Sequence, residues 1–85
     1  MSTVGPPIRY DGRVAIVTGA GAGLGKQYAL FLGSRGAKVC VNDLVEDSAA
    51  AVVAEITAAG GEAMACAASV TDGEAVVGAV MERWG

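Results

Sequence analysis

The sequence has no histidine, few aromatic residues and little charge of either sign. Its 85 residues carry six lysines and arginines against nine aspartates and glutamates, and no block of basic residues. Nucleic-acid binding is therefore not expected. Only 5% of the residues are aromatic, whereas 53% are hydrophobic and 13 are glycine. The core must then consist largely of alanine and valine, with backbones that run close together.

Long hydrophobic runs and frequent cysteines are also absent. No run reaches the roughly 18 residues that suggest a membrane helix, so we expect no membrane span and a soluble chain. Residues 1–12 contain both prolines and lack the hydrophobic centre of a secretory signal, so we interpret them as a lead-in segment. Cys40 and Cys66 do not have metal-ligand spacing. We expect both to be core residues in a reducing compartment, with the cytoplasm as the default location and no metal site.

Three short runs rich in small or branched hydrophobic residues predict β-strands. They span residues 13–18, 37–43 and 62–68. The first lies between two glycines and is predicted to be buried on both faces. The second becomes polar at Asn42 and Asp43, its carboxyl end, where ligands tend to bind in parallel sheets.

Helical periodicity follows each of these strands. Helices are predicted over residues 24–34, from residue 46 to a stop at residues 60–61, and after a capping box formed by Thr71 and Glu74. The side chains expected to face the core are Leu24, Tyr28, Phe31 and Leu32 in the first helix, Ala49, Val52, Val53 and Ile56 in the second, and Val76, Val77, Val80, Met81 and Trp84 in the third.

This alternation predicts an α/β fold with a Rossmann-type parallel sheet, because parallel strands need crossover connections. Right-handed crossovers place the first two helices on one face of the sheet and leave only the third for the other. Ile16, Val39 and Val41 would then lack cover. We therefore interpret residues 13–85 as a partial Rossmann domain, the first three βα units of a larger doubly wound fold, or as a chain whose open face a partner covers.

Four glycines, Gly19, Gly21, Gly23 and Gly25, separate the first strand from the first helix. Glycine allows positive φ and leaves backbone amides open to an anion, and the helix N-terminus adds a partial positive charge. A phosphate group is therefore the expected ligand of this turn.

Several phosphate-binding patterns compete for the turn. A nucleoside-triphosphate loop would need serine or threonine at Gln27, and the common dinucleotide pattern G-x-G-x-x-G does not fit in either register. The G-x-G-x-G pattern of methyltransferases fits from Gly19, although Val17 stands where an acid is typical. A methyltransferase or NTPase fragment thus remains an alternative.

The pattern T-G-x-x-x-G-x-G does fit, with Thr18, Gly19, Gly23 and Gly25, and it resembles the short-chain dehydrogenase/reductase family. Residues 41–44, together with residues 28–30, look most like the hydroxyacyl-CoA dehydrogenase modules of multifunctional β-oxidation enzymes and their bacterial relatives. The resemblance implies an oxidoreductase that uses a nicotinamide cofactor on an alcohol or ketone, with a peroxisome as an alternative location. The cofactor contacts implied at the turn are Gly19, Gly21, Ala22, Gly23, Leu24 and Gly25.

Asp43 indicates which nicotinamide cofactor is preferred. It lies about 20 residues after the glycine turn, where a carboxylate accepts hydrogen bonds from the adenosine ribose and repels a 2′-phosphate. Ala22 and Leu44 stand where NADP-selective members of the family often have a basic residue. NAD is therefore predicted, with Leu44, Ser69 and Val70 as further contacts to the adenosine end.

The family's catalytic serine and Tyr-x-x-x-Lys, and its Asn-Asn-Ala-Gly segment, are all absent from the 85 residues. We assign no catalytic residue and expect the chain alone to be inactive. The parent enzyme would transfer hydride between NAD and an alcohol or ketone, such as a 3-hydroxyacyl-CoA, and we expect it to be a homo-oligomer. The alternative is a complete nucleotide-binding or interaction module that pairs through its open sheet edge.

Overall fold

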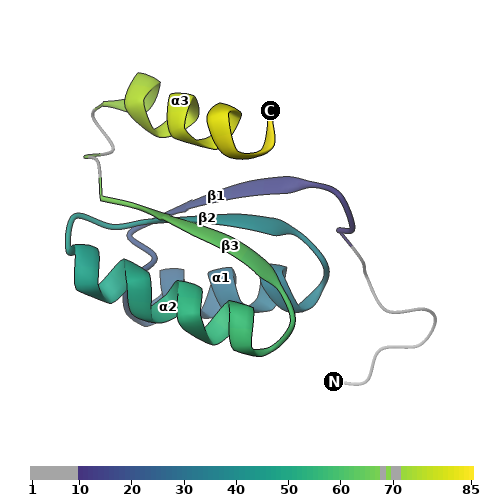
Figure 1. Cartoon of the computed structure of the whole chain (residues 1–85). Helices are drawn as coiled ribbons and strands as arrows, with labels where there is room; N and C mark the ends of the chain where they lie inside the picture. Colours follow the sequence, from purple (N-terminus) through teal and green to yellow (C-terminus); the bar gives the residue numbers. More distant parts are fainter. Residues whose placement is uncertain (1–9, 68, 70–71) are drawn as a thin grey trace.

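The computed structural model describes residues 10–67, 69 and 72–85, and these form three successive βα units (Figure 1). The elements are β1 (Val14–Thr18), α1 (Gly23–Ser34), β2 (Lys38–Asn42), α2 (Glu46–Ala58), β3 (Glu62–Cys66) and α3 (Gly73–Trp84).

All three strands are parallel and lie in the order β1-β2-β3. Helices α1 and α2 cover one face of the sheet and α3 lies over the other (Figure 1). The predicted α/β architecture, with a Rossmann-type parallel sheet and the first two helices on one face, is confirmed.

The two cores are set by the alternation of side chains along the central strand. Val39 and Val41 are fully buried in the cluster beneath α1 and α2, whereas Cys40, between them, packs with Val76 and Val80 of α3. The expectation that Val39 and Val41 lack cover is therefore wrong, because β2 has a strand on each side and α1 and α2 pack on the face to which these side chains point. Ile16 does lack cover, with 41% of its surface exposed.

Strand β1 is an edge of the described sheet and is not buried on both faces as predicted. Val14 and Ile16, on the face that α3 only partly covers, are 43% and 41% exposed. Val17, on the other face, packs against the larger core. A hydrophobic run alone does not distinguish a central strand from an edge strand.

The predicted core face of α1 is also wrong at three of its four positions. Leu24, Tyr28 and Phe31 are exposed, and only Leu32 packs against the core. The helix instead turns Ala29 and Gly33 inward. These small residues let the backbone approach its neighbours closely, so the large side chains remain outside.

The other two helices follow their predicted patterns more closely. In α2, Ala49, Val52 and Ile56 are buried, and Val53 packs partly against the same core. In α3, Val76 and Val80 are buried as predicted. Two further predicted core residues of this helix, Val77 and Met81, are 52% and 59% exposed. A single helix on this face buries one narrow stripe.

The two ends of α3 are held by side-chain hydrogen bonds. Asp72 is the N-cap, and its carboxylate accepts a hydrogen bond from the Ala75 amide at 3.4 Å. The helix therefore starts one residue later than the predicted capping box, whose Thr71 lies outside the described residues. At the other end Trp84 is half-buried, and its indole Nε1 donates to Glu62 of β3 at 2.6 Å.

Of the lead-in segment, only residues 10–12 are described. The Tyr10 amide donates to the Arg35 carbonyl oxygen at 2.8 Å, and its ring packs partly against the larger core.

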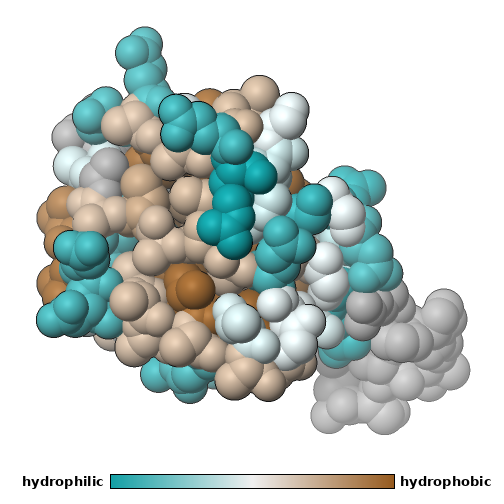
Figure 2. Space-filling view, viewed as in Figure 1, coloured by the Kyte–Doolittle hydropathy of each residue, from teal (hydrophilic) through white to brown (hydrophobic). Residues whose placement is uncertain are grey.

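Hydrophobic surface also remains between hydrophilic side chains on the face shown in Figure 2. Three strands and three helices thus leave part of the hydrophobic sequence exposed.

We expect Gly33→Ala to destabilise the chain by about 1–3 kcal/mol, because the added Cβ meets a packed core. That Cβ would lie 2.8 Å from Cγ2 of Ile56 in α2. Gly78→Ala in α3 is the matched control, since nothing lies within 4 Å of its Cβ. It should be neutral or stabilise by about 0.4–1 kcal/mol. Urea unfolding followed by circular dichroism measures the stability of both variants, and equal effects would contradict the close packing of Gly33 against Ile56.

The buried Cys40 thiol is expected to make the free energy of unfolding depend on pH in the alkaline range. Burial, with a smaller contribution from the nearby Cys66, raises the pKa of the Cys40 thiol to about 11, compared with the usual value of about 8.5. The unfolded chain therefore loses this proton first, and stability should fall as pH rises from about 8.5 towards 11. Denaturant unfolding across this range should show a steeper loss in the native chain than in Cys40→Ala. Parallel curves would contradict burial of the thiol.

Candidate site at the carboxyl edge of the sheet

The glycine turn joins the end of β1 to the start of α1. Gly19 and Gly23 have φ of +61° and +59°, in the left-handed region that side chains disfavour. Ala22, the N-cap, has an extended backbone and gives the first amides of α1 no side-chain acceptor. The positive end of α1 therefore opens on this edge of the sheet, and its amides can bind an anion.

Close backbone contacts fix the turn against the sheet. Gly25 lies directly against the carbonyl oxygen of Gly19, leaving no room for a Cβ. Ala20 is fully buried, and its amide donates to the Asn42 carbonyl oxygen of β2 at 2.9 Å. The turn is thus attached to the strand that precedes Asp43.

Asp43 stands at the carboxyl end of β2 and points towards the turn. Its Oδ1 accepts a hydrogen bond from the Val45 amide and its Oδ2 one from the Gly21 amide, each at 2.9 Å. These two bonds, first that of Val45 and then that of Gly21, lower the pKa of the Asp43 carboxyl. The group is therefore a carboxylate at neutral pH, with lone pairs left for further donors.

Asn42 also shapes this edge of the sheet, in a role that was not predicted from the sequence. It is buried, and its Nδ2 donates to the Cys66 carbonyl oxygen of β3 at 3.0 Å. The Asp43 amide donates to the same oxygen at 3.2 Å. Asn42 therefore ties the carboxyl ends of β2 and β3 together. The available signal was a polar residue within an otherwise hydrophobic strand.

These elements meet around a cavity of about 200 Å³. The residues that line it are Gly19, Asn42, Asp43, Leu44 and Ser69. All of them except Asn42 were predicted as site residues from the sequence.

The remaining predicted residues lie beside this cavity or are not described. Gly21 contacts Asp43 directly. Ala22, Gly23, Leu24 and Gly25 form the start of α1 and do not line the cavity. Val70 lies outside the described residues. The role of these positions as cofactor contacts stays a prediction.

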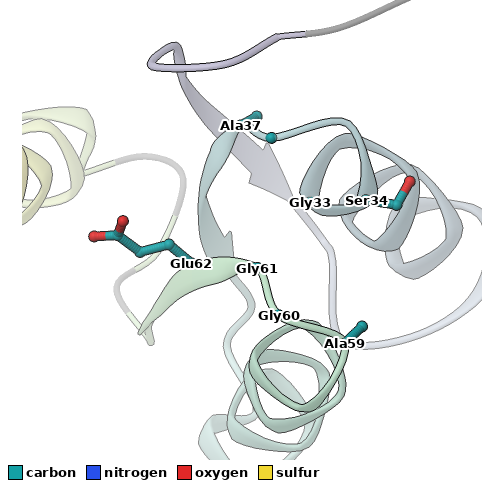
Figure 3. Close-up of a pocket in the computed structure, with 8 residues that line it drawn as sticks. Gly33, Ser34, Ala37, Ala59, Gly60, Gly61 and Glu62 are labelled. Carbon is teal, nitrogen blue, oxygen red and sulfur yellow. The ribbon is translucent and has the colours of Figure 1, made fainter. Parts of the chain in front are cut away.

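A larger cavity, of about 380 Å³, lies between the C-terminal ends of α1 and α2 (Figure 3). Its lining is mostly backbone and small side chains. Glu62, its single ionisable residue, turns its carboxylate away from the cavity towards α3 and accepts the Trp84 hydrogen bond. We therefore place the candidate site at the smaller cavity.

The part of the chain that the structure describes has neither a metal-binding cluster nor a membrane-spanning helix. Within residues 10–67, 69 and 72–85, no group of three or more histidine, cysteine, aspartate or glutamate residues could hold a metal ion. In the same part of the chain, no helix combines the length and hydrophobicity that crossing a membrane requires.

Comparison with known proteins gives a family match and close relatives. A family model described as short chain dehydrogenase matches residues 13–85. The chain is 50% identical over 94 residues to peroxisomal multifunctional enzyme type 2 of Drosophila melanogaster, covering 100% of this chain and 16% of that enzyme.

Two solved structures share the fold of this chain and are more than 40% identical to it in sequence. A hydroxysteroid dehydrogenase from Escherichia coli superposes with a TM-score of 0.86 at 41% identity, covering 91% of this chain and 34% of the other. A 7α-hydroxysteroid dehydrogenase in complex with NADH and 7-oxo glycochenodeoxycholic acid has a TM-score of 0.76 and 43% identity, covering 89% and 29%. The chain thus spans about a third or less of these relatives.

We expect Gly25→Ala to open the glycine turn and destabilise the chain by about 1–3 kcal/mol. Besides the Gly19 carbonyl oxygen, the new Cβ would lie 3.2 Å from the Ala20 Cα, and both are backbone atoms that cannot rotate away. Gly73→Ala, at the start of α3 with nothing within 4 Å, is the matched control. Denaturant unfolding measures both variants. A Gly25 variant as stable as the Gly73 variant would show that the close approach is not needed.

Proposed function

Because the chain belongs to the short-chain dehydrogenase family, whose model matches residues 13–85, we propose that it is the NAD-binding N-terminal part of an oxidoreductase. The observation that carries the proposal is the meeting of the glycine turn and the Asp43 carboxylate at one cavity. An anion-binding turn beside a hydroxyl-binding acid matches the pyrophosphate and ribose of a dinucleotide. Family membership also removes the support for a methyltransferase or an NTPase.

The pyrophosphate fits the glycine turn. Gly19 and Gly23 would have open space at a Cβ position, so a phosphate oxygen can approach the backbone without meeting a side chain. The N-terminus of α1 contributes a favourable interaction with the anion, typically about 0.3–1 kcal/mol. Gly19, Gly21, Ala22, Gly23, Leu24 and Gly25 form this cradle.

The adenosine ribose fits Asp43. Its carboxylate is ionised and accepts hydrogen bonds from hydroxyl groups, whereas the 2′-phosphate of NADP would bring a like charge to the same place. No lysine or arginine stands at Ala22 or Leu44 to offset that repulsion. NAD is therefore preferred over NADP, with Leu44, Ser69 and Val70 at the adenosine end.

The bound nicotinamide would supply hydride exchange with an alcohol or ketone carbon. This chain's residues hold and orient the adenosine half. Residues 1–85 do not contain a Tyr-x-x-x-Lys, which the family resemblance implies as the proton donor or acceptor for the reacting oxygen. We propose a secondary alcohol or its ketone as substrate, with a 3-hydroxyacyl thioester as the first candidate, given the similarity to a multifunctional peroxisomal enzyme. The chain alone should bind cofactor without turnover.

We expect Asp43→Ala to weaken NAD binding by about ten- to a hundredfold, since it removes charge-assisted hydrogen bonds to the ribose. NADP binding should fall less, because the same change removes the repulsion of the 2′-phosphate. Isothermal titration of both cofactors into the 85-residue chain measures the two affinities.

Asp47→Ala is the matched control for this test. Asp47 is an exposed acid in the first turn of α2, so its loss changes the net charge equally without touching the cavity. Its NAD affinity should stay within about twofold of the native chain. Equal losses of NAD and NADP in Asp43→Ala would contradict the role given to Asp43.

A further inference from the structure

Gly21 is a glycine whose backbone does not require glycine. Gly19 and Gly23 have positive φ, but Gly21 does not, so its conformation would accept an alanine. What a side chain there would lack is space. A Cβ at Gly21 would lie 2.8 Å from Oδ2 and 2.9 Å from Cγ of Asp43, and 2.7 Å from Cβ of Ser48.

The same residue also donates to the carboxylate that it approaches. The Gly21 amide is 2.9 Å from Oδ2, while the Val45 amide holds Oδ1 at the same distance. A carboxylate with both oxygens bound to backbone amides cannot rotate freely. Each oxygen can still accept a further hydrogen bond, so the pair presents two fixed acceptors side by side.

We propose that Gly21 is a positioning residue that determines cofactor specificity. Its amide donates a hydrogen bond to Asp43, and its lack of a side chain leaves room for the carboxylate. Asp43 is thereby held where it accepts hydrogen bonds from the ribose diol of NAD and repels the 2′-phosphate of NADP. This inference rests on the proposed NAD site. It adds that the acid at the end of β2 is not sufficient for selectivity. A carboxylate free to turn could move away from a 2′-phosphate, whereas one held on both oxygens keeps its charge where that phosphate would lie.

The first test is Gly21→Ala in the 85-residue chain, with NAD and NADP affinities measured by isothermal titration. We expect NAD affinity to fall by about tenfold and NADP affinity by less than about threefold, so that the ratio between them narrows. Adding Ser48→Gly removes the contact with α2 and leaves the contact with Asp43. The narrowed ratio should persist in this double variant, and its recovery would assign the effect to α2 and overturn the proposal.

The second test asks whether Gly21 acts through Asp43. In an Asp43→Ala background, Gly21→Ala should leave the NAD/NADP ratio unchanged, because there is no carboxylate left to position. If it narrows the ratio by the same factor as in the native background, Gly21 acts directly on the cofactor and the proposal fails. Gly78→Ala, a glycine substitution in α3 far from the cavity, should leave both affinities unchanged.

A third readout does not need the cofactor. The Asp43 carboxyl can be titrated by NMR in the free chain, and its pKa should rise in Gly21→Ala as the amide hydrogen bond is lost. An unchanged pKa, in a variant whose circular dichroism matches the native chain, would overturn the inference. If the native chain binds neither cofactor, the proposed function fails on its own, and this titration still decides whether Gly21 positions Asp43.

Discussion

The hydrogen bonds between the glycine turn and the carboxyl end of β2 are the constraint on which the candidate site depends. The Ala20 amide bonds to the Asn42 carbonyl oxygen, and the Gly21 amide bonds to the Asp43 carboxylate on the following residue. Two adjacent residues of the turn are thus tied to the last residue of β2 and to the residue that follows it. The anion-binding end of α1 and the acid are thereby held at one edge of the sheet.

Glycine residues in α1 allow this helix to pack closely against the glycine turn and against α2. Gly25 lies against the Gly19 carbonyl oxygen, and Gly33 lies against Ile56, so α1 approaches both the turn and α2 more closely than a helix with larger residues could. The consequence is that α1 keeps Leu24, Tyr28 and Phe31 on its outer side. The exposed hydrophobic side chains of α1 and the close packing of the glycine turn therefore have the same cause.

The sequence predictions succeeded where the pattern depends on local chemistry. Alternating strands and helices and the glycine stops predicted the parallel sheet, and the acid at the carboxyl end of the second predicted strand indicated that Asp43 lies near the turn. The predictions failed where burial depends on neighbours. Val39 and Val41 are covered because β2 is central, and Val14 and Ile16 are exposed because β1 is an edge of the described sheet.

The sequence by itself determined the order of the elements, the family resemblance and the residue types at the glycine turn, since each follows from spacing along the chain. Only the tertiary structure decided why Gly21 is glycine, because the atoms that exclude a Cβ belong to Asp43 and Ser48, more than twenty positions away. It also revealed Asn42 as the link to β3. Contacts of this kind depend on where separate segments meet in space, and no local pattern encodes that distance.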